Sequence, residues 1–200
     1  PSFEYATSIR WILTRSPAMP RLFTALDLPD DVLTTLRAFQ GDQALPGRAR
    51  WTPMNNHHIT LRFIGDVDKD TSDAIEAALS AVRAEPFPIE PLGLGVLPSR
   101  RKPRVLTVRV DASERLRNLY RSVQDALAAV DIQREERRYR PHITLARLKE
   151  VTPERLYTAL REMDDPQLDA FPVDRFYLYE STLTPDGAVH TVRAAYPLDA

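Results

Sequence analysis

Apolar and polar residues along the chain follow two different periods, which predict strands interleaved with helices. A period of two, or a short apolar run between turn residues, predicts strands at 21–28, 57–64, 105–110, 142–148, 171–180 and 188–196. Apolar residues recurring every three or four positions predict helices at 31–40, 70–84, 113–130 and 153–163. The proline-rich stretch 88–98 fits an irregular edge strand, because proline cannot donate a backbone hydrogen bond.

The order of these elements predicts the fold class. Strands and helices alternate along most of the chain and two strands close it, which indicates an α+β fold. No segment has the composition of a flexible linker, so we expect residues 19–200 to form a single domain. The regular pattern begins directly after Met19. We therefore expect Met19 to be the natural start and residues 1–18 to be an N-terminal extension, non-native or disordered.

One tetrapeptide occurs twice in predicted strands. His58–Leu61 and His142–Leu145 both have the sequence His-Ile-Thr-Leu. Because side chains alternate along a strand, the histidine and threonine of each copy share one face, and the isoleucine and leucine share the other. The apolar face belongs in a core, so the His/Thr face must meet water, a partner or a ligand. Two such strands could bring two imidazoles and two hydroxyls into one site.

Two histidines and two threonines suit acid–base chemistry on a phosphate. Imidazoles with pKa values of about 6.5 can hold opposite protonation states, so one takes a proton from a nucleophile while the other gives one to a leaving group. Threonine hydroxyls can donate to the non-bridging phosphate oxygens. The pattern favours in-line attack on a phosphodiester, particularly a strained cyclic one, without a metal, a thiol or a covalent intermediate. The alternative is that each histidine is a hydrogen-bonded structural residue.

The composition excludes several other kinds of site. The chain has no cysteine, which excludes disulfides, thiolate metal sites and a cysteine nucleophile, and fits a reducing, cytoplasmic location. Only 6 glycines stand against 17 prolines, and neither glycine-rich nucleotide motif occurs. With 27 basic and 28 acidic residues, the net charge of −1 gives no overall field for duplex DNA. No apolar run is long enough to span a membrane.

The sequence around both tetrapeptides is similar to that of a known enzyme family. Residues 21–31, 50–67, 138–147 and 176–181 resemble the RNA 2′,3′-cyclic phosphodiesterase family, historically called 2′-5′ RNA ligase or LigT-like. This family is part of the two-histidine (2H) phosphoesterase superfamily, named for paired HxTx motifs. The resemblance implies two pseudo-symmetric lobes of antiparallel sheet with outer helices around a central cleft, and one HxTx strand in each lobe.

The resemblance also implies roles for the motif residues. His58 would be the general acid that protonates the departing 3′ oxygen, and His142 the general base that activates water. Thr60 and Thr144 would hold the phosphate, and the product would be an RNA 2′-phosphomonoester. The reverse reaction would join a cyclic end to a 5′-hydroxyl through a 2′-5′ link. The implied partner is RNA with a cyclic end or a 2′-5′ linkage, bound by a monomer without metal or cofactor.

Three further residues are weaker candidates for substrate binding. In the resembling family an arginine commonly follows HxTL at the position of Arg147, although strict alternation places Arg147 off the His142 face. Arg62 shares the His58 face by alternation, where it would contact phosphate or solvent. Tyr139 could stack on a base or a ribose.

Other residues near the motifs are expected to be structural. Alternation places Phe63 in the core and His57 on the face opposite His58, and His190 is expected to be structural or on the surface. Trp51 is expected to be a lid or core residue. Two basic runs could form an electropositive rim for RNA or could be solvated loops: Arg134, Arg137, Arg138 and Arg140, and residues 100–104.

Three alternatives remain open. The same site could act on a small cyclic nucleotide, an ADP-ribose cyclic phosphate or a 2′-5′ oligonucleotide. The chain could instead be a non-catalytic RNA-binding module, which would show affinity without turnover. A histidine-based metal site is a further alternative; no HxxxH motif accompanies either copy, and chelator sensitivity would identify it.

Overall fold

The fold is built on one large antiparallel sheet. The computed structural model describes residues 19–185 and 187–199, so the extension expected at residues 1–18 lies outside the described residues. The strand order is β10-β9-β1-β3-β7-β6-β5, with β2 paired to β7. These strands are β1 (Arg21–Leu26), β2 (Arg50–Trp51), β3 (Ile59–Asp66), β5 (Pro91–Ser99), β6 (Lys102–Val110), β7 (His142–Arg147), β9 (Arg175–Thr184) and β10 (Gly187–Pro197). The predicted α+β class and the edge position of β5 are confirmed.

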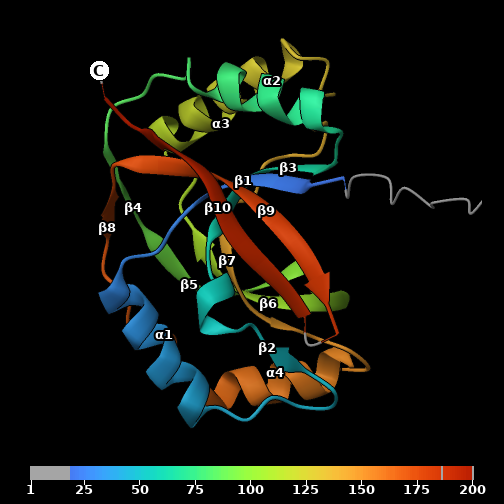
Figure 1. The fold of residues 1–200 in the computed structure, drawn as a ribbon. Helices are drawn as coiled ribbons and strands as arrows, with labels where there is room; N and C mark the ends of the chain where they lie inside the picture. The colour runs from blue at the N-terminus through green and yellow to red at the C-terminus, as the bar shows by residue number, and fades with distance from the viewer. Residues whose placement is uncertain (1–18, 186, 200) are drawn as a thin grey trace, which may run out of the picture.

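The sheet consists of two halves joined at one point. Between β3 and β7, the one paired position is Ile59 opposite Ile143, whereas every other neighbouring pair of long strands shares several positions. We call β10-β9-β1-β3 the His58 lobe and β7-β6-β5 with β2 the His142 lobe. One HxTx segment therefore lies in each lobe, and the two segments meet where the lobes join (Figure 1).

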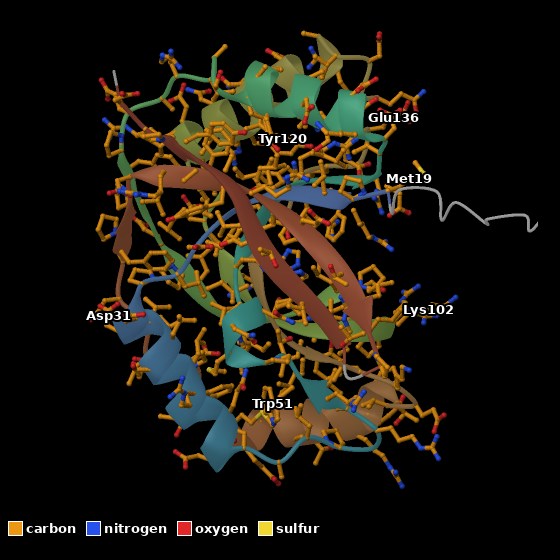
Figure 2. All side chains as sticks on the ribbon, viewed as in Figure 1. Met19, Asp31, Trp51, Lys102, Tyr120 and Glu136 are labelled. Atoms are coloured by element: carbon orange, nitrogen blue, oxygen red, sulfur yellow. The ribbon has the colours of Figure 1, made fainter. Side chains whose placement is uncertain are left out.

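Helices lie at both ends of the molecule. They are α1 (Asp30–Asp42), α2 (Lys69–Leu79), α3 (Glu114–Ala128) and α4 (Pro153–Glu162). Figure 1 shows α2 and α3 together at one end and α1 and α4 at the other; in Figure 2, the labels of Tyr120 and Trp51 lie toward these two ends. Side chains of Asp68, Ser113 and Thr152 cap α2, α3 and α4 by accepting backbone N–H bonds. A small second sheet pairs β4 (Phe87–Ile89) with β8 (Phe171–Val173).

The sheet has a core face and a face that carries the motif histidines, which we call the site face. Ile59 and Ile143 are fully buried in the main core, so the alternating His and Thr residues lie on the opposite face. Phe23 and Tyr179 form a separate buried cluster on the site face of the His58 lobe.

A β-bulge at the last residue of the first motif reverses the alternation. Thr24 pairs with Arg62 but Ala25 pairs with Thr60, so Leu61 is one extra residue in β3. Arg62 therefore lies on the core face, and Phe63 comes to the site face with half of its surface exposed. Two predictions are thereby wrong: Arg62 does not share the face of His58, and Phe63 is not a core residue.

A second bulge lies at the last residue of the second motif. Thr107 pairs with Thr144 and Leu106 pairs with Ala146, so Leu145 is the extra residue in β7. Leu145 and Ala146 are both fully buried, and Arg147 returns to the site face, where it is exposed. The prediction that Arg147 lies off the His142 face is wrong for this reason.

Candidate active site

The two motifs lie crosswise where the lobes join. Because Ile59 pairs antiparallel with Ile143, continuing that register by one residue in each direction sets His58 opposite Thr144, and Thr60 opposite His142. The two motifs thus run antiparallel past each other where the lobes join. The structure brings the four predicted site residues together on one face of the sheet.

His58 is enclosed by aromatic rings. Its Nε2 lies 3.0 Å from the Thr60 hydroxyl, its ring centroid is 4.9 Å from that of Phe23, and His190 meets it edge-on at 5.6 Å. Burial and the positive charges of His190 and His142 lower the pKa of His58 to about 4, while a hydrogen bond donated by the imidazole to the Asn56 backbone carbonyl acts in the opposite direction.

His142 is oriented by its own backbone. Its Nδ1 lies 2.7 Å from the Arg140 carbonyl oxygen, and a carbonyl can only accept a hydrogen bond. Nδ1 therefore carries the proton of the neutral ring, which leaves Nε2 with a free lone pair. Burial lowers the pKa of His142, and the bond to Arg140 opposes that shift. A neutral imidazole with an unprotonated Nε2 can serve as a proton acceptor.

The weaker candidates Arg62 and Tyr139 form structural contacts behind the site face. The Arg62 guanidinium donates to the Gln133 carbonyl at 2.5 Å and lies 3.6 Å from Glu135, both in the segment after α3. The Tyr139 ring stacks on Tyr120 with 4.1 Å between centroids, and its hydroxyl lies 3.3 Å from the Thr60 carbonyl. These contacts fix the backbone of Thr60 and the loop beside it.

The site face of the His58 lobe is aromatic. Phe23 stacks on Phe63 at 5.4 Å and on Tyr179 at 5.2 Å between centroids, and His190 meets Phe23 edge-on at 4.8 Å. Phe63 is 50% exposed and so offers a ring to a planar ligand. His190, expected to be structural or on the surface, is half-buried beside His58.

The site face of the His142 lobe is cationic. Arg109 is the strand partner of His142, and its guanidinium donates to the carbonyls of Leu92 and Leu94 at 2.5 and 3.2 Å. Arg50 pairs with Arg147 across β2 and β7. Both of these arginines are exposed, and among the described residues neither forms an ion pair.

The remaining expected residues lie away from the reacting groups. His57 is buried and bonded to Gln40 and the Pro53 carbonyl. Trp51 packs against the core beside Phe39. Two arginines of the first basic run are in surface ion pairs, Arg134 with Asp125 and Arg137 with Glu135. In residues 19–185 and 187–199, no three histidine or carboxylate side chains gather as metal ligands, and no helix has the length and apolarity to cross a membrane.

Comparisons with known proteins agree with this geometry. A family model described as the 2′-5′ RNA ligase superfamily matches residues 27–184. The chain is 33% identical over 177 residues to a Thermotoga maritima protein named RNA 2′,3′-cyclic phosphodiesterase, which covers 86% of this chain and 92% of that protein. An Aeropyrum pernix protein of the same name is 36% identical over 137 residues, covering 68% of this chain and 78% of that protein.

Solved structures show the same fold. The apo crystal structure of Escherichia coli LigT superposes with a TM-score of 0.74 at 22% identity, covering 92% of this chain and 100% of LigT. TT0787 of Thermus thermophilus superposes with a TM-score of 0.72 at 29% identity, covering 89% of this chain and 97% of that one. Proteins with only 22% and 29% sequence identity to this chain thus share its two-lobed sheet.

Proposed function

This chain belongs to the 2′-5′ RNA ligase superfamily, and we propose that it hydrolyses RNA 2′,3′-cyclic phosphodiester ends to 2′-phosphomonoesters. The observation that carries this proposal is the antiparallel meeting of the motifs at Ile59 and Ile143, which brings both histidines and both threonines to one face of the sheet. A phosphate seated between the two threonines would have one imidazole on either side. That is the arrangement required by in-line displacement at phosphorus.

In the proposed reaction each histidine moves one proton. His142 accepts a proton from water at Nε2 as the water oxygen bonds to phosphorus. The bond from phosphorus to the 3′ oxygen breaks, and His58 donates its proton to that oxygen. Thr60 and Thr144 donate hydrogen bonds to the non-bridging oxygens, for which Thr60 exchanges its present contact with His58. A 5′-hydroxyl in the place of water would give a 2′-5′ link by the same displacement, with the 3′ oxygen again leaving.

The two lobes favour RNA over a small cyclic nucleotide. Phe63 and Arg147 each follow their motif histidine by five residues, and both reach the site face because of the bulges. An exposed aromatic ring can stack on the terminal base, and exposed arginines can contact the phosphates upstream of it. A small cyclic nucleotide would use only the first of these.

A cyclic-ended oligoribonucleotide tests the proposal. The purified protein is incubated in EDTA with an oligomer that ends in a 2′,3′-cyclic phosphate, beside the same oligomer ending in a 3′-phosphate. We expect the cyclic end to open to a 2′-phosphate and the second oligomer to remain unchanged. Tight binding without turnover would support a non-catalytic RNA-binding module, and loss of turnover in EDTA would indicate a metal-dependent site.

The pH dependence of kcat/KM should be bell-shaped, with its maximum below pH 6.5. A general acid loses activity as pH rises through its pKa, and the pKa of His58 in the free protein is about 4. A general base loses activity as pH falls through its pKa, which burial of His142 also lowers. A bound phosphate anion favours both imidazolium forms, so kcat should peak at higher pH than kcat/KM. Initial rates across the acidic and neutral range check this, and coincident maxima would argue against it.

Substituting Arg147→Ala should weaken the binding of long substrates more than short ones. Removing one phosphate contact is expected to raise KM for a cyclic-ended oligomer about tenfold. The slope of the logarithm of affinity against the logarithm of salt concentration should become less steep by about one. KM for a mononucleoside 2′,3′-cyclic phosphate should change much less, because it has no upstream phosphate. The matched control is Arg37→Ala on α1, which removes another exposed positive charge. Equal effects on both substrates would place Arg147 at the reacting phosphate instead.

A further inference from the structure

Asp27 lies beside His58 although the proposed reaction does not use it. It directly follows β1, whose last pair sets Leu26 opposite Ile59, and one further step of that register sets Asp27 opposite His58. Both side chains line the same cavity of about 120 Å³, together with Tyr179 and His190. A polar cavity of this size can hold bridging water.

The Asp27 carboxylate is held in a fixed orientation. Its Oδ1 accepts a hydrogen bond from the Tyr179 hydroxyl, and Tyr179 is itself fixed by stacking on the buried ring of Phe23. One carboxylate oxygen remains for the cavity. Burial raises the pKa of Asp27, and the bond from Tyr179 acts in the opposite direction.

The groups that face His58 disfavour its protonated form. His58 therefore needs a nearby negative charge to act as a general acid. His190 approaches from β10, His142 from β7 and His57 from the preceding residue, and each of them is neutral or positive. The neighbouring Tyr179 and Thr60 are uncharged. Among the residues that line the cavity, Asp27 is the one acidic side chain.

We propose that Asp27 is a positioning residue for His58, which orients its ring and stabilises its protonated form across the cavity through bridging water. The proton remains on His58, and the carboxylate supplies the negative charge that an imidazolium requires. This inference rests on the proposed function, because it explains how His58 can be the general acid. Asp27 acts through His58 and does not touch the substrate.

The other lobe has the opposite charge at the equivalent place. There the strand neighbour of His142 is Arg109, a cation that disfavours a second positive charge on the adjacent imidazole. A carboxylate beside His58 and a guanidinium beside His142 would separate the two proton affinities. The arrangement therefore distinguishes the acid from the base in a site whose two motifs are identical in sequence.

The test is the pH profile of Asp27→Asn, which removes the charge but keeps an acceptor for Tyr179. A general acid becomes inactive as pH rises through its pKa, so this limb of the kcat profile should move to lower pH by about one unit. At neutral pH kcat should then fall about tenfold, with KM almost unchanged. The control Asp66→Asn, an exposed carboxylate at the far end of β3, should leave the profile unchanged.

A second readout requires no turnover. The His58 imidazole is titrated by NMR in wild type and Asp27→Asn, with inorganic phosphate as the probe, and its pKa should be lower in the variant. Tyr179→Phe should lower the His58 pKa by a smaller amount. If Asp27→Asn does not fold, Tyr179→Phe replaces it in the test. An unchanged His58 titration overturns the inference, as does a raised KM with an unchanged kcat profile, which would make Asp27 a sugar-binding residue. A shifted titration in a protein that does not open cyclic ends would leave this inference standing and refute the proposed function.

Discussion

His58→Ala and His142→Ala should each lower kcat on a cyclic-ended oligoribonucleotide by about a factor of 10² to 10⁴, the usual contribution of a positioned proton donor or acceptor. The reason is geometric, because the two motifs meet at Ile59 and Ile143 and bring both imidazoles to one face of the sheet. Without His142 the attacking water keeps its proton, and without His58 the 3′ oxygen leaves as an alkoxide. Single-turnover rates measured at saturating substrate check the effect on chemistry separately from binding.

Two comparisons separate the roles of the histidines. A phosphodiester with a nitrophenol leaving group needs no proton donor, so His58→Ala should lose much less activity on it, whereas His142→Ala should lose the same factor as on RNA. The double variant should be little worse than either single variant, because the two residues act as one unit. Circular dichroism and thermal melting control for folding. More than a tenth of wild-type kcat in either single variant would contradict a general acid–base pair.

The duplicated motif made the histidines and threonines of the site predictable from the sequence. Alternation within His58–Leu61 and His142–Leu145 correctly separates a buried face from a polar one, since Ile59 and Ile143 are fully buried. That separation depends only on residues within each strand. The order of strands and helices was predictable for the same reason, because hydrophobic periodicity is a local property of the chain.

The positions immediately after each motif were not predictable. A bulge depends on the register between neighbouring strands, and periodicity in a single strand does not contain that register. One extra residue, Leu61 in β3 and Leu145 in β7, reverses the expected faces of the residues directly after it. Phe63, expected in the core, and Arg147, expected off the His142 face, therefore both lie on the site face, where they give the two lobes their aromatic and cationic character.

The surroundings of His58 depend on segments far apart in sequence. The β9–β10 hairpin crosses the site face, where the Asn56 amide donates to the Ala188 carbonyl at 2.7 Å and His190 reaches His58. No local pattern marks His190, within β10, or Asp27, directly after β1, as a neighbour of His58. Only the assembled sheet brings them to the same cavity.

Phe23→Ala should destabilise the protein by about 3–5 kcal/mol, the usual cost of removing a buried phenylalanine side chain. Phe23 is 1% exposed, and its ring lies 4.8 to 5.4 Å from those of His58, His190, Tyr179 and Phe63. Removing it leaves a cavity directly beneath the proposed acid, so kcat should fall as well even where the variant is still folded. Urea unfolding measures the first effect, and kcat well below the unfolding midpoint measures the second.

Phe63→Ala is the matched control, because it removes the same ring from the same stack at an exposed position. Its unfolding free energy should change by less than about 1 kcal/mol, since little buried surface is lost. Its KM for RNA should instead rise about tenfold, the expected cost of one base–aromatic contact. If Phe23→Ala lost stability but kept the kcat of the wild type, then the ring beneath His58 would be part of the core alone, and the position of the imidazole would have to be set by Thr60 and the backbone of Asn56.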